Sequence, residues 1–338
     1  MSANTSAFSP KEFTVGIAEE TTVGTAPSTF TGIEVEAISL PTINDLRITE
    51  QRAGSQGRIV NTGDLLRHEA GAVHEFSVSG VLTSELLPIL MENATGVEHA
   101  SNVVKVLYNH APVSFLHGAT SSGSHNTVAF HIKGVSAFNS SYTLKGCIIT
   151  SLTINANSSE NGGRFTFDLT AQTRSPFSSS ASSASTVNAY STNFRYLSHF
   201  TDDKMVNDTD VILDSVGLTI ENPAIFLGNK VSGSDYGLPE AYQRSIPDFK
   251  VMANCVVKYD TNTIDFLDNW RTQTVPAKGL YLADHATWGS ADTFGINLAK
   301  SFISEQPSFQ EDDYLKVNVI MQGVSDSSSD SLLEVIVA

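Results

Sequence analysis

The segment RHEAGAVHE contains the residues best suited to hold a metal ion, with His68 and Glu69 followed by His74 and Glu75. Zinc enzymes of the H-E-x-x-H type place two histidines one helical turn apart, and the spacing in this segment differs from that pattern. The second pair also falls in a stretch that alternates between apolar and polar residues, as a strand does. We therefore interpret these histidines as surface or interface residues.

The segment NDTDVILD offers Asp208, Asp210 and Asp214 as possible oxygen ligands for calcium. It lacks the central glycine and the terminal glutamate of an EF-hand loop. The segment is therefore interpreted as a polar turn that enters a strand. The sequence predicts neither a metal site nor a cofactor.

The sequence contains no P-loop and no G-x-S-x-G nucleophile motif. Its two cysteines, Cys147 and Cys255, each lie in an apolar run, where a buried free thiol is expected. No residue is assigned a catalytic role. We predict that the protein is not an enzyme.

The composition of the 338-residue chain limits the possible functions. A hydrophobic fraction of 41% can form the cores of two ordinary domains. A net charge of −16 argues against a protein that grips nucleic acid through its phosphates, which requires Lys and Arg. The N-terminus lacks the features of a secretory signal, and no stretch approaches the roughly 20 apolar residues of a membrane span, so we expect synthesis in a cytoplasm and no membrane partner.

Short alternating runs bounded by Gly, Ser, Asn and Asp dominate the chain, which predicts a mainly β fold. In the first half the expected strands are IEVEAISL, DLRITEQR, HEFSVSGVL, NVVKVLY, TVAFHIKG, GCIITSLTINAN and RFTFDLTAQT. In the second half they are VILDSVGLTIEN, DFKVMANCVVKYD, GLYLAD, TFGINLAK, YLKVNVIMQG and LLEVIVA.

One pattern occurs twice, in EFSVSGVLTSELLPILMENATG and in VMANCVVKYDTNTIDFLDNW. Each segment spells a strand, a polar corner and a short apolar helix. Ser84 and Thr261 are expected to be the helix N-caps, and Gly96 is expected to end the first helix. The simplest account is two tandem β-sandwich units, each with one short flanking α-helix and a long loop.

The predicted division of the chain is a first unit with an N-terminal arm at 1–174, a linker or long loop at 175–192, and a second unit at 193–338. The middle segment is rich in serine and too poor in apolar residues to pack a core. Each unit also carries a long insertion before its helix, at 53–72 and at 223–247. These insertions contain apolar residues, so we expect arms that become ordered against another subunit.

The sequence resembles the tail tube proteins of tailed bacteriophages. The opening VGIAEETTVGTAPSTFTGIEVEAISLP resembles a G-x-x-x-E-T-x-x-G-T stretch of that family, with Gly16, Glu20, Thr21, Gly24 and Thr25 in the matching places. The segment RAGSQGRIVNTGDLLRHEAGAVHEFSVSGVLTSELLPILMENATG resembles the loop, strand and helix that follow. The ending FGINLAKSFISEQPSFQEDDYLKVNVIMQGVSD…SLLEVIVA resembles the closing strands. The Ser-rich segment and the second unit depart from the pattern, because many tail tube proteins lack them.

The resemblance implies a β-sandwich or half-barrel subunit of the virion that self-assembles into stacked rings. The inner β-barrel of these rings would surround an acidic-lined channel that conducts the genome into the host cell. A duplicated chain implies a ring of three with pseudo-sixfold symmetry, and six subunits is the alternative. The implied partners are other copies of the chain and the tape measure, tail terminator and distal tail proteins, with DNA passing through without specific binding and with synthesis in the host cytoplasm.

Three groups of residues are assigned to these roles as hypotheses. The inter-ring stacking loop comprises Arg52, Arg58, Ile59, Leu65, Leu66 and Arg67. The second long loop contributes an interface of Phe226, Leu227, Tyr236 and Leu238. The channel-lining acids are Glu34, Glu36, Glu50 and Asp168.

The main alternative is a two-domain β-sandwich binding module, such as a virion adhesin or a lectin-like protein, and an enzyme ranks third. A lectin-like site would need aromatic and acidic or amide residues together on loops at one end. The segment around Trp288, DHATWGSAD, is the one such cluster in the sequence.

Overall fold

The computed structural model describes most of the chain. The described residues are 13–39, 47–49, 65–67, 73–107, 113–120, 127–134, 141–174, 179–180, 186–200, 203–230, 238–244, 249–284, 288, 294–324 and 331–337. Within them the fold is mainly β, as predicted, with two α-helices, α1 (Leu86–Thr95) and α2 (Phe266–Thr272). Two short 3-10 turns lie at Asn161–Gly163 and Leu197–His199.

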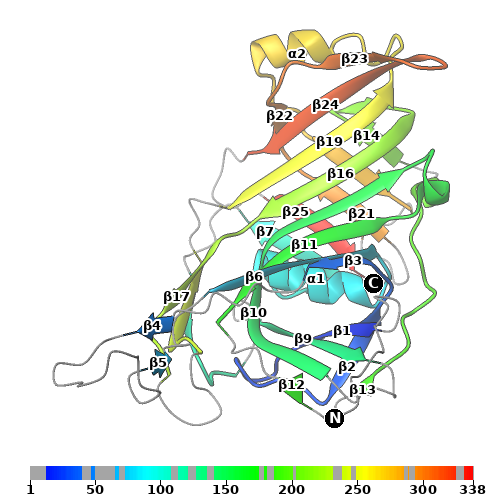
Figure 1. Cartoon of the computed structure of the whole chain (residues 1–338). Coiled ribbons are helices and arrows are strands. Elements are labelled where there is room, and N and C mark those ends of the chain that lie inside the picture. Colours follow the sequence, from blue (N-terminus) through cyan, green and yellow to red (C-terminus); the bar gives the residue numbers. More distant parts are fainter. Residues whose placement is uncertain are drawn as a thin grey trace.

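A long antiparallel sheet, which we call the central sheet, is the main feature of the molecule (Figure 1). Its strands follow each other in the order β3-β6-β11-β10-β16-β19-β24, and β22 and β23 both pair with the far side of β24. The bounds are β3 (Val35–Ser39), β6 (His74–Val81), β11 (Thr166–Thr173), β10 (Ser141–Asn157), β16 (Leu213–Glu221), β19 (Lys250–Lys258), β24 (Leu315–Gly323), β22 (Ser301–Ile303) and β23 (Ser308–Glu311).

The first part of β10 belongs to an N-terminal extension of this sheet, which runs β13-β2-β1-β9-β10. Its strands are β13 (Thr186–Val187), β2 (Thr29–Ile33), β1 (Phe13–Glu19) and β9 (Val128–Gly134), and β12 (Ser179–Ser180) also pairs with β10. The two strands β12 and β13 lie within the Ser-rich segment. The division of the chain into two units and a linker stays a prediction.

A second sheet and a helix cover one face of the central sheet. The second sheet has the order β15-β14-β20-β21-β25-β7, with β15 (Thr209–Asp210), β14 (Asp203–Val206), β20 (Leu280–Ala283), β21 (Phe294–Leu298), β25 (Ser331–Val337) and β7 (Val103–Leu107). Phe167 and Leu218 of the central sheet share one hydrophobic cluster with Leu90 of α1 and with Ile296 and Val335 of the second sheet. The molecule is therefore a β-sandwich with α1 packed inside its layers.

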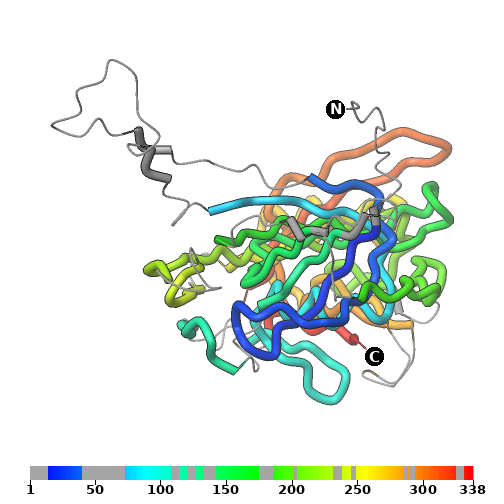
Figure 2. The backbone as a smooth tube through the Cα atoms, turned by 60° about the horizontal axis from the view of Figure 1, so that its bottom comes forward, coloured from blue at the N-terminus to red at the C-terminus, as the bar shows by residue number. Residues whose placement is uncertain are grey.

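The two insertions form smaller ladders. In the first, β4 (Arg47–Thr49) pairs with β5 (Leu65–Arg67), so the DLRITEQR run joins this ladder instead of the central sheet. In the second, β17 (Ala224–Leu227), β18 (Ala241–Arg244) and β8 (Val113–Leu116) form a three-stranded sheet that we call the arm sheet. Figures 1 and 2 show the β17–β18 hairpin projecting at the side of the central sheet.

The order of elements is duplicated along the central sheet. The run β3-β6-β11-β10 and the run β16-β19-β24-β22/β23 have the same neighbours and the same antiparallel directions. In each run the first strand leads into the insertion, the second strand leads into the helix, and the last two are consecutive in the chain. This duplication agrees with the pattern seen in the sequence.

The helices begin later than predicted, by one residue for α1 and by four residues for α2, whereas the predicted end of α1 at Gly96 is confirmed. The residues before the helices are Glu85 and Asp265, and neither makes a side-chain cap hydrogen bond. The first turn of α1 closes on the main-chain carbonyl of Thr83, which accepts hydrogen bonds from the two following leucines, so Ser84 lies inside the turn. Gly96 ends the helix with φ 74° and donates to the carbonyl of Glu92 at 2.7 Å.

Glu20 fixes the bend at which β10 passes from the N-terminal extension into the central sheet. The register of β10 shifts between Leu144 and Cys147, and Gly146 between them has a φ of 59°. The fully buried carboxylate of Glu20 accepts hydrogen bonds from Gly146 N at 2.8 Å, Gly24 N at 2.7 Å and Thr127 Oγ1 at 2.6 Å. Burial raises the pKa of Glu20, and these donors oppose the rise.

Replacing the Glu20 carboxylate should destabilise the fold. The variant Glu20→Gln turns an amide NH₂ toward donors, which leaves at least one buried N–H without an acceptor. We expect the free energy of unfolding to fall by about 2 kcal/mol. Urea unfolding followed by circular dichroism measures it, with Glu160→Gln, at an exposed position, as the control. Equal stabilities of the two variants would contradict the bracing role.

Candidate assembly interface

The two runs of strands meet inside the chain where β10 pairs with β16, and we call this the internal junction. The register extends from Ser151 opposite Glu221 to Asn157 opposite Ser215. On the face of the sheet that points away from the core, the hydroxyls of Thr153 and Thr219 are 3.2 Å apart. The last strand of the first run thus joins directly to the first strand of the second.

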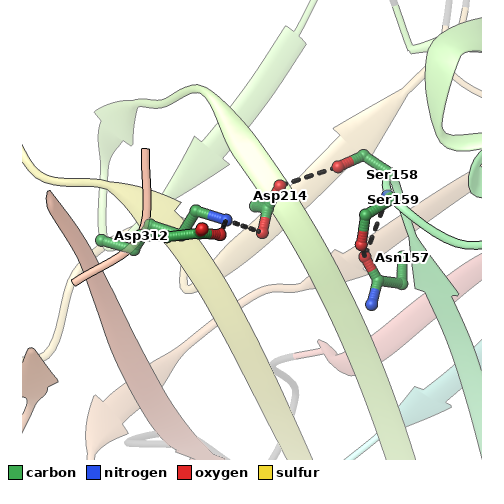
Figure 3. Close-up of polar contacts among 6 residues, drawn as sticks. Asn157, Ser158, Ser159, Asp214 and Asp312 are labelled. Carbon is green, nitrogen blue, oxygen red and sulfur yellow. Dashed lines mark hydrogen bonds and ion pairs between the residues drawn. The ribbon is translucent and has the colours of Figure 1, made fainter. Parts of the chain in front are cut away.

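Asp214 connects both sides of the internal junction at the end of the strands (Figure 3). Ser158 donates its main-chain N–H to the carbonyl of Asp214 at 2.8 Å and its hydroxyl to Oδ1 at 2.7 Å. From the other side, Lys316 Nζ reaches Asp214 Oδ2 at 2.9 Å and Asp312 Oδ2 at 2.8 Å. The two carboxylates, Asp312 first, raise the pKa of Lys316, and the ammonium in turn lowers the pKa of Asp312.

The aspartates considered for calcium engage different partners. Asp208 accepts hydrogen bonds from the main-chain N–H groups of Ala277 and Lys278 at 2.7 and 2.8 Å, while Asp214 belongs to the internal junction. Within the described ranges, no group of three or more His, Cys, Asp or Glu is placed to hold a metal ion.

Two edges of the central sheet have no strand beside them in the part of the chain that is described. At one end β3 pairs only with β6, and at the other end β22 and β23 pair only with β24. All four side chains of β23 are exposed, including Phe309, which is 50% exposed and contacts Tyr259 edge-on. Unprotected strand edges are ready templates for pairing with another chain.

The face of the central sheet that points away from the core is polar, and we call it the open face. Side chains alternate along β6, β11, β10, β16, β19 and β24 apart from the bulges in β10 and β16, and the residues that point away from the core belong to this face, with Met252, Val256 and Ile320 as apolar members. Its members include Glu75, Ser77, Ser79, Thr166, Asp168, Thr170, Gln172, Ser151, Thr153, Asn155, Ser215, Gly217, Thr219, Glu221, Lys250, Asn254, Lys258, Lys316, Asn318 and Gln322. Hydroxyl and amide groups outnumber charges on this face.

Three of the four sequence-predicted channel acids lie among the described residues. Asp168 is exposed on the open face, opposite Ser79 on one side and Thr153 on the other. Glu36 is exposed on β3, whereas Glu34 is half-buried and lies 3.8 Å from Arg164 Nη1. Glu50 lies outside the described residues.

The stacking-loop residues are only partly described. Arg52, Arg58 and Ile59 lie outside the described residues, while Leu65, Leu66 and Arg67 make up β5, whose main chain pairs with β4. The role assigned to this loop stays a prediction.

The residues predicted for the second long loop separate into two faces of the arm sheet. Phe226 and Leu238 are buried within the chain, and Tyr236 lies outside the described residues. The inner face is formed by three rings, in which Tyr242 stacks on Phe115 with centroids 5.1 Å apart and contacts Phe226 edge-on at 5.7 Å. The outer face carries three exposed aliphatic residues, Leu227 at 42%, Ile225 at 51% and Leu116 at 66% exposure.

Arg244, which sequence reasoning missed, anchors the arm sheet beside the internal junction. Its buried guanidinium donates to the carbonyls of Asn93 at 2.6 Å and of Ala94, Ile149 and Asn222 at 3.3 Å each. Desolvation lowers the pKa of Arg244 to about 9. A cation near the C-terminal end of α1 also interacts favourably with the helix dipole. The alternation of Tyr242 and Arg244 along β18 was the available signal, because it places both on the inner face.

The residues that the alternative functions would use are buried or contact other residues of the chain. Trp288, the centre of the lectin-like cluster, stacks on Tyr281 with centroids 5.3 Å apart. Cys147 and Cys255 are buried free thiols, and burial raises the pKa of Cys255 to about 12. No helix in the described part of the chain has the length and apolar character to cross a membrane.

A family model described as phage tail tube protein matches residues 13–323, which is nearly the whole chain. A search of curated proteins finds no match.

The internal junction should depend more on Asp214 than on Asp312, although both contact Lys316. The Asp214 side chain is 17% exposed and also binds Ser158, whereas Asp312 is 62% exposed. We expect Asp214→Asn to lower the midpoint of urea unfolding clearly and Asp312→Asn to leave it nearly unchanged, because exposed ion pairs contribute little. Equal effects in matched urea titrations would contradict this ranking.

Proposed function

The chain belongs to the phage tail tube protein family and is a structural component of the virion tail, and on that premise we propose that its copies join into rings that stack to form the tube. The channel of the tube conducts the genome. The observation that carries the proposal is the central sheet, which continues across both runs of strands and, among the residues that the structure describes, ends on each side in an edge with no strand beside it.

The position of these edges supports ring formation. The edge at β3 and the edge at β23 lie at opposite ends of one sheet. Contacts between two different surfaces repeat head to tail and produce a closed ring when the rotation closes. Each chain contributes two runs of strands, so three chains give a ring with pseudo-sixfold symmetry, and six chains are the alternative.

The open face is the proposed channel wall. The other face of the central sheet packs against the core. A barrel built from this sheet therefore has the open face available to line a channel. Phosphate groups are bound mainly by Lys and Arg. The open face carries Lys250, Lys258 and Lys316 beside Asp168, Glu75 and Glu221. The Lys316 ammonium is paired with two carboxylates and Lys250 lies directly opposite Glu221, so the face has no excess of positive charge to hold DNA.

Two of the acidic residues proposed to line the channel lie on or beside the open face. Asp168 belongs to the open face, and Glu36 is exposed at the β3 edge. Glu34 and Glu50 remain sequence-based candidates. The conduction mechanism is passive and includes no covalent step.

The insertions are the proposed contacts between rings and with other tail proteins. The first insertion carries Arg52, Arg58 and Arg67, which can form forked hydrogen bonds with carboxylates of the neighbouring ring. The second presents the aliphatic outer face of the arm sheet, with Ile225 and Leu227 exposed. At the ends of the tube the same surfaces are available to tape measure, terminator and distal tail proteins.

Assembly of the purified protein tests the proposal. Negative-stain electron microscopy of a concentrated sample should show rings or hollow tubes, and light scattering should give the mass of a three-chain ring or, under the alternative, a six-chain ring. A preparation that stays monomeric across concentration and salt would contradict the proposed function.

Deleting residues 55–69 should separate stacking from ring formation. The deletion removes Arg58 and Arg67 but none of the central-sheet strands, so folded subunits are expected to form rings that no longer stack. Far-ultraviolet circular dichroism checks the fold, and electron microscopy counts rings against tubes. Tubes of normal length would refute the role of this insertion.

A further inference from the structure

The internal junction provides a template for the contact between chains. We infer that β23 of one copy pairs antiparallel with β3 of the next copy, in the register that β10 and β16 use within the chain. The inference rests on the proposed function and specifies which residues meet. The occupant of each free edge is therefore a second copy of this chain.

The strands β3 and β16 occupy equivalent places at the start of their runs, and both contain a β-bulge. In β16, Leu213 pairs with Val257 and Ser215 with Val256, so Asp214 is an extra residue in a β-bulge. In β3, Val35 pairs with Gly80 and Ala37 with Ser79, so Glu36 is the extra residue. Each bulge lies at the same distance from the end of the paired strand, because Gly80 and Val257 both directly precede the last residue of β6 and β19. Bulges define strand register, so the β3 edge is shaped like the β16 edge.

The strands β23 and β10 are equivalent in the same sense. Each directly precedes its hairpin partner, β24 or β11, but the connection differs, with three residues (312–314) after β23 and eight residues (158–165) after β10. Ser308 lies opposite Asn318 as Thr153 lies opposite Asp168. Gln310 therefore occupies the place of Asn155.

When the register of the β10–β16 pairing is applied to β23 and β3 of two copies, it predicts which residues lie opposite each other. Asn155, Ala156 and Asn157 lie opposite Gly217, Val216 and Ser215 within the chain. The corresponding pairs between copies place Gln310 opposite Ser39 and Glu311 opposite Ile38. Gln310 and Glu311 are both exposed in the single chain, so they are accessible to a second copy.

The two junctions differ at one contact. Inside the chain the Ser158 hydroxyl donates to Asp214. Between copies Glu36 takes the place of Asp214, and the bend that follows β23 (312–314) brings Asp312 and Asp313 to this end of the strands, so carboxylates gather where the internal junction has a hydrogen bond. Like charges that lie opposite each other weaken strand pairing, so the junction between chains is weaker than the internal one.

Cysteine cross-linking tests the register. The full chain carrying Gln310→Cys and Ser39→Cys is assembled and mildly oxidised. Directly opposed residues have Cα atoms about 4.5–5.5 Å apart, within the range of a disulfide, whereas the offset pair Gln310→Cys and Ala37→Cys lies at about 7–8 Å. Native Cys147 and Cys255 are buried and do not compete.

We expect the first pair to give covalent oligomers on a non-reducing gel and the offset pair and both single variants to give far fewer. Rings or tubes that form without this cross-link would overturn the register while the proposed function stands. Absence of rings in the unmodified chain would overturn both.

A second variant tests the mismatch of carboxylates. Asp313→Ser removes one of these carboxylates and should strengthen each contact between chains by about two- to fivefold. The readout is the protein concentration at which rings appear by light scattering. Asp210→Ser, an exposed position on β15 with the same change in charge, is the matched control. An equal shift in both variants would show a general charge effect and would contradict the predicted contact.

Discussion

The buried carboxylate of Glu20 is the constraint on which the arrangement of sheets depends. It accepts hydrogen bonds from Gly24, from Thr127 and from Gly146 at the bend of β10. Because β10 is the strand shared by the N-terminal extension and the central sheet, the bend decides how these two layers meet. A side chain at Gly146 would also collide with Tyr242, since its Cβ would lie 2.4 Å from the phenol oxygen. The bend thus links the core to the arm sheet.

The internal junction gathers the other long-range contacts of the molecule. Arg244 binds main-chain carbonyls from α1, from β10 and from the residue that follows β16, so the arm sheet is anchored beside the place where the two runs meet. Asn222 adds hydrogen bonds from its side-chain amide to the carbonyls of Ala94 and Thr95. A projecting element with such an anchor stays aligned with the sheet from which it extends. This alignment suits an element proposed to contact a neighbouring ring.

Much of the fold could be predicted from alternation along the chain, because each central strand has one apolar and one polar face. The period-2 patterns identified β6, β11, β16, β19 and β24, and the glycine signal identified the end of α1. Pairing between distant strands carries no comparable signal, so the internal junction and the arm sheet could not be predicted. Phe226 and Leu238 were assigned to an interface because β8, which lies more than a hundred residues earlier, was not known to pair with the second insertion. Arg244 was missed because its partners are main-chain carbonyls, which no residue type reveals.

Duplication within one chain also changes the entropy of assembly. A contact between two separate molecules loses translational and rotational freedom, whereas a contact between linked segments forms at a high effective concentration. The β10–β16 pairing closes during folding and does not depend on how much protein is present. In the proposed ring, half of the junctions are therefore complete before any two molecules meet, and dilution can open only the other half.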